Sequence, residues 1–162
     1  MNISMEVVGV RVEMPSNQPI ILLKESEGHR FLPIWVGASE ATAIAFVQQG
    51  VQAPRPMTHD LMADVIEGLD AVVTSVYISK IEEGVFFAEL NLRTSAGVAV
   101  TISARPSDAI ALALRTHSNI LATPKVLEEA GIAIPAEGGE DNQEVERFRQ
   151  FLDEINPEDF AG

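Results

Sequence analysis

Apolar and polar residues alternate near the start of the chain, where Val8, Val10, Val12 and Met14 fall on one side. A period of two predicts a β-strand, here over residues 3–14. Short apolar runs bounded by turn-forming residues predict the other strands, over residues 20–24, 31–36, 70–81, 85–93 and 98–104. Two of the turns between these runs end in glycine, which indicates antiparallel hairpins.

Helix-forming residues follow the strands. Residues 38–49 are rich in good helix formers and stop before Gly50. Another helix is expected from His59, with Thr58 as its N-cap. The remaining expected helices cover residues 106–116, 124–130 and 144–155. The last of these carries apolar residues at helical spacing, so we expect an amphipathic helix that needs a surface to pack on.

The chain resembles itself when it is shifted by 68 residues, which places residues 34–46 on residues 102–114. Each half has three expected strands, then a serine, an acidic residue and an alanine-rich helix. This pattern predicts a duplicated β-β-β-α unit, and hence an α+β protein with a largely antiparallel sheet and packed helices.

The repeat places Ser39 and Ser107 where each can cap its helix, and Glu40 and Asp108 in the first helical turn. A negative charge in that turn is favoured by the helix dipole, so helix capping alone can explain the pair. The alternative is that these two carboxylates bind a divalent metal at equivalent strand-to-helix junctions.

Length and charge divide the chain into two parts. A chain of 162 residues is typical of one domain, which we place at residues 1–135. Residues 136–162 contain 9 of the 24 acidic residues and only 2 of the 11 basic ones, and are interpreted as an acidic linker and the C-terminal helix. The net charge of −13 disfavours contact with polyphosphate, so a nucleic-acid site needs a local basic patch or a metal.

The lack of cysteine excludes disulfides and thiolate zinc sites. The N-terminus has no basic start, and no apolar run approaches about 20 residues, so we expect a soluble cytoplasmic protein without a membrane segment. Apolar runs such as residues 20–23 and 98–102 carry no charge, and strand edges of that kind need covering. A homodimer is therefore expected.

Residues 55–61 bring a base, a hydroxyl, an imidazole and a carboxylate to one helix start: Arg55, Thr58, His59 and Asp60. A helix N-terminus offers free N–H groups to an anion. His59 has the chemistry of a general acid or base near neutral pH, and Asp60 that of a ligand for Mg²⁺ or Mn²⁺. The alternative is a capped helix in which His59 makes a structural hydrogen bond.

Residues 105–109 form a second such motif, with Arg105 and Pro106 immediately before Ser107 and Asp108. Proline is well placed at a helix start. The Arg105 guanidinium suits a phosphate or a carboxylate. The alternative is an internal salt bridge from Arg105 to Asp60, Asp108 or Glu40.

Taken in order, five stretches resemble the bifunctional nuclease domain over roughly residues 5–135, and the two arginine-proline motifs are the most specific of them. These stretches are residues 32–37, 40–41, 55–61, 84–88 and 105–113. The C-terminal tail is similar to an extension of bacterial members, especially actinobacterial ones.

The resemblance implies a nuclease that hydrolyses DNA and RNA with a divalent metal, Mg²⁺ or Mn²⁺. It implies that Glu40, Asp60 and Asp108 hold the metal and that His59, Asp60, Arg105 and Asp108 are catalytic. It implies a substrate-binding role for Arg55, Thr58 and Ser107. The alternative is a non-catalytic oligomeric module that binds a partner protein or a small anionic ligand, with the arginine-proline motifs as structural clamps.

Overall fold

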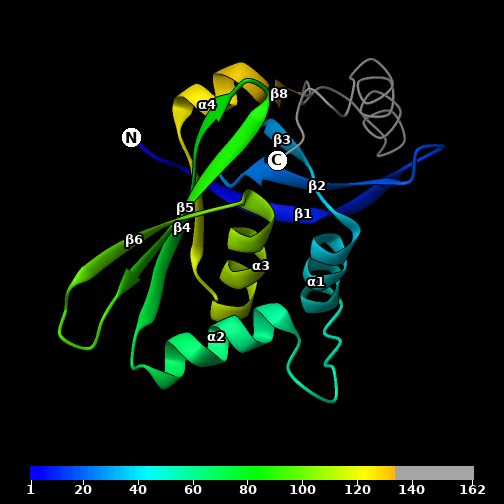
Figure 1. The fold of residues 1–162 in the computed structure, drawn as a ribbon. Helices are drawn as coiled ribbons and strands as arrows, with labels where there is room; N and C mark the ends of the chain where they lie inside the picture. Colours follow the sequence, from blue (N-terminus) through cyan, green and yellow to red (C-terminus); the bar gives the residue numbers. More distant parts are fainter. Residues whose placement is uncertain (134–162) are drawn as a thin grey trace.

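One eight-stranded sheet runs through the part of the molecule that the computed structural model describes, residues 1–133 (Figure 1). Its strand order is β6-β5-β4-β7-β1-β2-β3-β8. The strands are β1 (Ile3–Glu13), β2 (Gln18–Glu25), β3 (Arg30–Trp35), β4 (Val72–Glu82), β5 (Val85–Arg93), β6 (Ala99–Ala104), β7 (Asn119–Ala122) and β8 (Ile132–Ala133). All neighbours pair antiparallel except β4 and β7, which are parallel. The predicted α+β class is confirmed.

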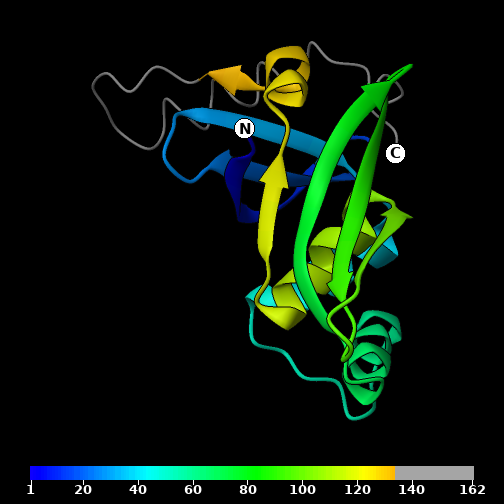
Figure 2. The same ribbon diagram turned by 90° about the vertical axis from the view of Figure 1, so that its left-hand side faces the viewer.

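The described residues form four helices: α1 (Ala38–Gln48), α2 (Thr58–Gly68), α3 (Pro106–Thr116) and α4 (Pro124–Ala130). Helix α3 packs against α1, α2 and the strands β4 and β5. Helix α2 lies at one end of the molecule, and α4 lies towards the other (Figures 1 and 2). The predicted C-terminal helix over residues 144–155 lies outside the described residues, as does the whole predicted second segment, residues 136–162.

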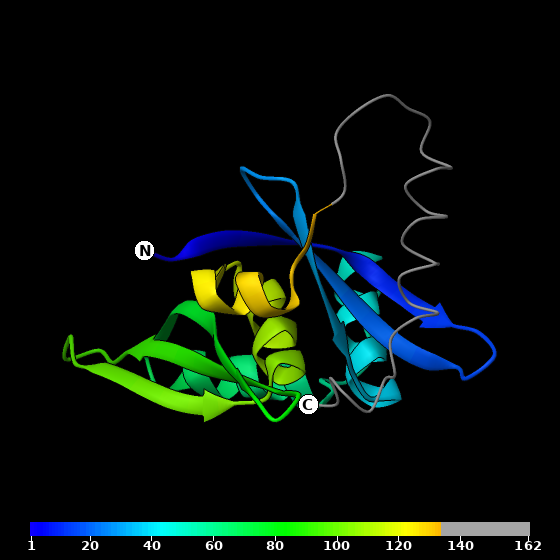
Figure 3. The same cartoon turned by 90° about the horizontal axis from the view of Figure 1, so that it is seen from above.

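The predicted duplication is present as two units, β1-β2-β3-α1 and β4-β5-β6-α3. Adding 68 to the bounds of α1 gives the bounds of α3. The two units lie on either side of β7, which pairs with β4 from one unit and β1 from the other. Seen from above, α1 and α3 stand side by side next to the sheet (Figure 3).

Helix α3 lies close to its neighbours because several of its buried side chains are small. Ala109, Ala111 and Ala113 are each at most 2% exposed, which lets the helix backbone approach the sheet and α1 closely. In the first unit, β2 is buried on both faces, and this explains why residues 20–23 are continuously apolar instead of alternating. Within residues 1–133, none of the helices combines the length and apolarity needed to cross a bilayer.

Candidate functional site

The first turns of three helices meet at a network of charged side chains. Arg105, at the N-cap of α3, donates from Nε to Asp108 Oδ2 and from Nη2 to Glu40 Oε1, each at 2.8 Å. His59, the second residue of α2, lies 2.8 Å from Asp108 Oδ1 through its Nε2. Helices α1, α2 and α3 are therefore joined where their N-termini carry partial positive charge, which favours the two carboxylates.

The duplicated units contribute differently to this network. The repeat counterpart of Arg105 is Gly37, the N-cap of α1. A Cβ atom at position 37 would collide with Oε2 of Glu40, so glycine leaves the space that this carboxylate occupies. One unit thus supplies room at its helix start, and the other supplies the guanidinium that crosses between them.

Both carboxylates of the network are stabilised in the charged form. Burial raises the pKa of Asp108, but hydrogen bonds from Arg105 and His59 outweigh it, so the pKa lies below its usual range. The backbone N–H of Glu40 and the Arg105 guanidinium lower the pKa of Glu40. Asp108 and Glu40 in turn raise the pKa of Arg105. All three groups are charged at neutral pH.

The imidazole of His59 is held in a defined orientation. The residue is 8% exposed, and its Nε2 is occupied by Asp108. Nδ1 has no hydrogen-bond partner within residues 1–133. No fully buried side-chain nitrogen or oxygen of that part lacks a partner, so Nδ1 keeps contact with solvent. A carboxylate on one ring nitrogen and an accessible second nitrogen is an arrangement suited to proton transfer.

Asp60, next to His59, belongs to a second ion pair. Arg115 Nε donates to Asp60 Oδ1 at 2.6 Å, and the backbone N–H of Met57 donates to Asp60 Oδ2 at 3.0 Å. The other two nitrogens of Arg115 donate to the carbonyl oxygens of Ala43 and Ala111. The hydrogen bond from Arg115 makes the largest contribution to lowering the pKa of Asp60, and the hydrogen bond from the Met57 N–H makes the next largest.

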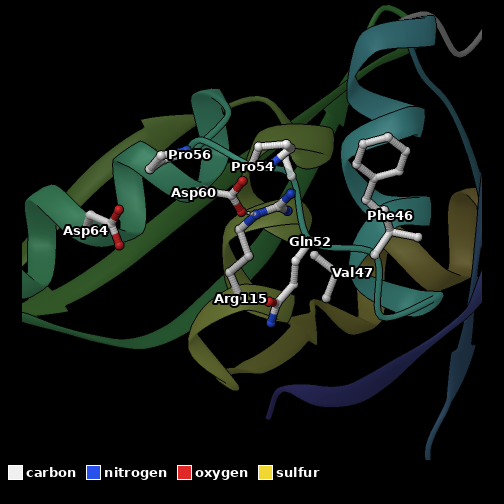
Figure 4. Close-up of a pocket in the computed structure, with 10 residues that line it drawn as sticks. Phe46, Val47, Gln52, Pro54, Pro56, Asp60, Asp64 and Arg115 are labelled. Atoms are coloured by element: carbon white, nitrogen blue, oxygen red, sulfur yellow. Dashed lines mark hydrogen bonds and ion pairs between the residues drawn. The ribbon is translucent and has the colours of Figure 1, made fainter.

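A groove of about 440 Å³ lies beside this second pair. The Asp60–Arg115 pair occupies its middle, Asp64 of α2 lies at one end, and Phe46 of α1 lies towards the other (Figure 4). Most of the remaining wall is apolar and comes from the segment between α1 and α2. Asp60 lines this groove and Asp108 does not.

Comparison with known proteins identifies the family of the chain. Residues 21–135 match the sequence profile of the bifunctional nuclease domain. The chain belongs to the bifunctional nuclease domain family. Two proteins of Mycobacterium tuberculosis, one from strain H37Rv and one from strain CDC 1551, are each 48% identical to it over 160 residues. The match covers 95% of this chain and 95% of theirs, and both carry the name of uncharacterised proteins. The resemblance inferred from the motifs is confirmed.

The structure separates the residues that the family resemblance implied. Glu40, His59, Arg105 and Asp108 form one connected network, whereas Asp60 pairs with Arg115. Within residues 1–133, no side-chain hydrogen bond joins the remaining three residues to this network. Arg55 and Thr58 are exposed, Arg55 has no ion-pair partner within residues 1–133, and Ser107 is 4% exposed.

The predicted capping residues were wrong. Helix α2 begins at Thr58, and its N-cap is Met57, whose N–H is satisfied by the Asp60 carboxylate. The N-caps of α1 and α3 are Gly37 and Arg105, so Ser39 and Ser107 lie inside the helices. The residue three positions after each N-cap is acidic, and in α2 its carboxylate accepts a hydrogen bond from the N–H of the N-cap residue.

Sequence reasoning did not single out Arg115. A signal was available, because Arg115 is the only charged residue after Asp108 in an otherwise apolar, alanine-rich helix. A charge in such a helix requires a partner when the helix is buried. The side chain is 8% exposed, and three separate groups accept from it.

The three carboxylates proposed as metal ligands do not surround a common point. Within residues 1–133, no group of three or more His, Cys, Asp or Glu side chains is arranged to hold a metal ion. Arg105 engages Glu40 and Asp108, and Arg115 engages Asp60, so a metal shared by all three would have to replace these contacts. The set does not fit one shared ion in this arrangement, and the divalent metal stays a prediction.

Proposed function

We propose that this chain hydrolyses phosphodiester bonds of DNA and RNA, with His59 as the proton-transfer group. The observation that carries the proposal is the 2.8 Å contact between His59 Nε2 and Asp108 Oδ1, beside a guanidinium. Asp108 holds the imidazole in place, so that Nδ1 takes a proton from the attacking water. The water oxygen bonds to phosphorus, the bond to the leaving oxygen breaks, and the imidazolium returns the proton to that oxygen.

Arg105 supports the same reaction through its unused donors. A guanidinium has five N–H groups, and the contacts to Asp108 and Glu40 use one on Nε and one on Nη2. The side chain is 55% exposed, so the remaining N–H groups are available to a phosphate. Charge that develops on the phosphate oxygens is stabilised by such a fixed donor.

The second candidate is a non-catalytic module that binds a partner protein or a small anion. The internal pairing of both arginines favours it, since Arg105 and Arg115 hold helices together without any ligand. Structural clamps of this kind need neither a free imidazole nitrogen nor a substrate. The two candidates therefore predict different effects of a His59 replacement on the rate of hydrolysis.

A hydrolysis assay on the purified full chain separates them. Single- and double-stranded DNA and RNA are incubated with Mg²⁺, Mn²⁺ or EDTA. His59→Asn should lower the rate by about 10²- to 10⁴-fold while the protein stays folded, because general acid–base catalysis contributes that range. Asp108→Asn should lower it as well, since the imidazole loses its orienting carboxylate.

The matched control is Glu27→Gln, at an exposed position in the turn between β2 and β3. Equal degradation by wild type, control and His59→Asn means that a contaminating enzyme is responsible, and the proposal then fails. Activity that disappears in EDTA and in Asp60→Asn, but persists in His59→Asn, would instead assign the reaction to a metal.

A further inference from the structure

Helix α2 exposes most of its apolar side chains. Leu61, Val65 and Leu69 are 55%, 52% and 72% exposed, and Met62 is 36% exposed. His59 is the only buried residue of α2. A helix advances about 100° per residue, so these four side chains cover an arc of roughly 100° that points away from the core contacts of Ala63 and Ile66. We call Leu61, Met62, Val65 and Leu69 the α2 stripe.

The border of the α2 stripe is acidic. Asp60, Asp64 and Glu67 follow one side of the helix, and residues 58–68 contain no lysine or arginine. Arg115 neutralises Asp60, whereas Asp64 has no ion-pair partner within residues 1–133. Asp64 also forms one end of the 440 Å³ groove, so an unpaired carboxylate stands where the stripe and the groove adjoin.

We propose that α2 docks a basic amphipathic helix of another protein, whose apolar face covers the α2 stripe and whose lysine or arginine enters the groove at Asp64. Exposed apolar surface rimmed by charge is characteristic of protein interaction sites. An amphipathic helix laid along such a surface is a recurring mode of peptide recognition. The opposite charge is required of the partner, since α2 brings no lysine or arginine to the interface but the carboxylates of Asp64 and Glu67, which are unpaired within the described part of the chain.

The same charge argument disfavours the two occupants that this chain itself provides. A second copy docked through α2 would bring four such carboxylates together, the Asp64 and Glu67 of each copy, from helices without lysine or arginine. The tail of residues 136–162 has 9 acidic and 2 basic residues, so it carries the same sign as the border of the stripe. The inference does not depend on hydrolysis, because none of the stripe residues belongs to the His59 network.

A binding titration tests the proposal with a synthetic, fluorescently labelled 18-residue helix of leucine and lysine at amphipathic spacing. Fluorescence anisotropy with the full chain should show saturable binding that weakens as sodium chloride rises, because salt screens the charge pairs. The same peptide with glutamate in place of lysine should not bind. Comparable binding of both peptides would overturn the charge requirement.

Variants locate the site. Val65→Glu should weaken binding by about tenfold, since it places a charge at the centre of the apolar contact. Asp64→Lys should weaken it by about fivefold, the scale of one exposed charge pair. Glu27→Lys makes the same change in net charge at an exposed turn elsewhere and should change the affinity by less than about twofold.

Circular dichroism and thermal melting establish that each variant is folded. Equal weakening by Asp64→Lys and Glu27→Lys would show non-specific attraction to an acidic protein and overturn the proposal. Sedimentation of the chain without peptide tests whether a second copy of the chain covers the α2 stripe. If wild type is a dimer, Val65→Glu is a monomer and the lysine peptide does not bind, the stripe is a self-association surface and the proposal is wrong.

Discussion

Arg105 and Arg115 lie at opposite ends of α3, and each binds a carboxylate from another helix. Arg105 reaches Glu40 of α1, and Arg115 reaches Asp60 of α2. The two arginines differ in burial, because the Arg105 side chain is 55% exposed and that of Arg115 is 8% exposed. Loss of its partners destabilises the folded protein more for a buried arginine than for an exposed one, because water cannot replace the lost contacts of the buried side chain.

Replacing Arg115 with methionine should therefore destabilise the protein in a pH-dependent way. At pH 7 we expect a loss of about 1–3 kcal/mol in the free energy of unfolding, because the carbonyls of Ala43 and Ala111 and the Asp60 carboxylate lose a donor. Arg115 lowers the pKa of Asp60 in the folded state. The stabilisation from this pair is thus present above the ordinary aspartate value of about 3.9 and is lost as pH falls through the folded value.

Urea unfolding curves at pH 7 and near pH 3 measure this effect. The difference between wild type and Arg115→Met should be smaller at the lower pH. Arg93→Met, at an exposed strand end, is the control and should change stability by less than about 0.5 kcal/mol at either pH. An unchanged difference between the two pH values would assign the loss to packing and carbonyl contacts instead of the ion pair.

At the scale of elements, α3 is the helix on which the rest of the site depends. It carries Arg105 at its start and Arg115 in its last turn, and it packs against α1, α2 and the sheet. The alanines that allow this close packing were visible in the sequence, and so were the bounds of α3. The strand β7 was not predicted, because four residues are too few to show a period.

Ala111→Leu should disturb this element. Ala111 is fully buried, so a larger side chain forces apart α3 and its neighbours, at a cost of about 1–3 kcal/mol. Ala99→Leu, on the exposed end of β6, is the matched control and should be tolerated within about 0.5 kcal/mol. Chemical denaturation compares the two, and similar stability of both variants would show that α3 is less closely packed than described.

At the scale of the whole molecule, β6 ends the sheet, and one of its edges has no strand partner within residues 1–133. The strand is uncharged, most of its residues are exposed, and Ile102 is 47% exposed. Uncharged edges of this kind are prone to pair with another chain. The homodimer stays a prediction, and β6 is the surface that we expect to form it.

Ile102→Lys tests the predicted dimer. A lysine on the edge should convert a dimer into a monomer in sedimentation experiments, because two copies would place like charges next to each other. Val8→Lys has a similar exposure but lies in β1, inside the sheet, and should leave the oligomeric state unchanged. A dimer that persists in Ile102→Lys would exclude β6 as its contact.

The sequence by itself determined the repeat, the order of β1 to β6 and of the four helices α1 to α4, and the charged residues that stand at the helix starts. These features depend on local preferences: the period of apolar residues, the glycines and prolines that end elements, and the acids favoured in a first helical turn. They also sufficed to place the chain in its family, because the motifs carry their own spacing.

Only the tertiary structure decided which charges meet. Sequence reasoning left three carboxylates open as partners of Arg105 and considered none for Arg115. The packing of α1, α2 and α3 selected Asp108 and Glu40 for Arg105 and Asp60 for Arg115. The same packing put His59 and Asp60, neighbours in the chain, into different clusters. Adjacent residues on a helix point about 100° apart, so the contact of each depends on elements that lie far away in sequence.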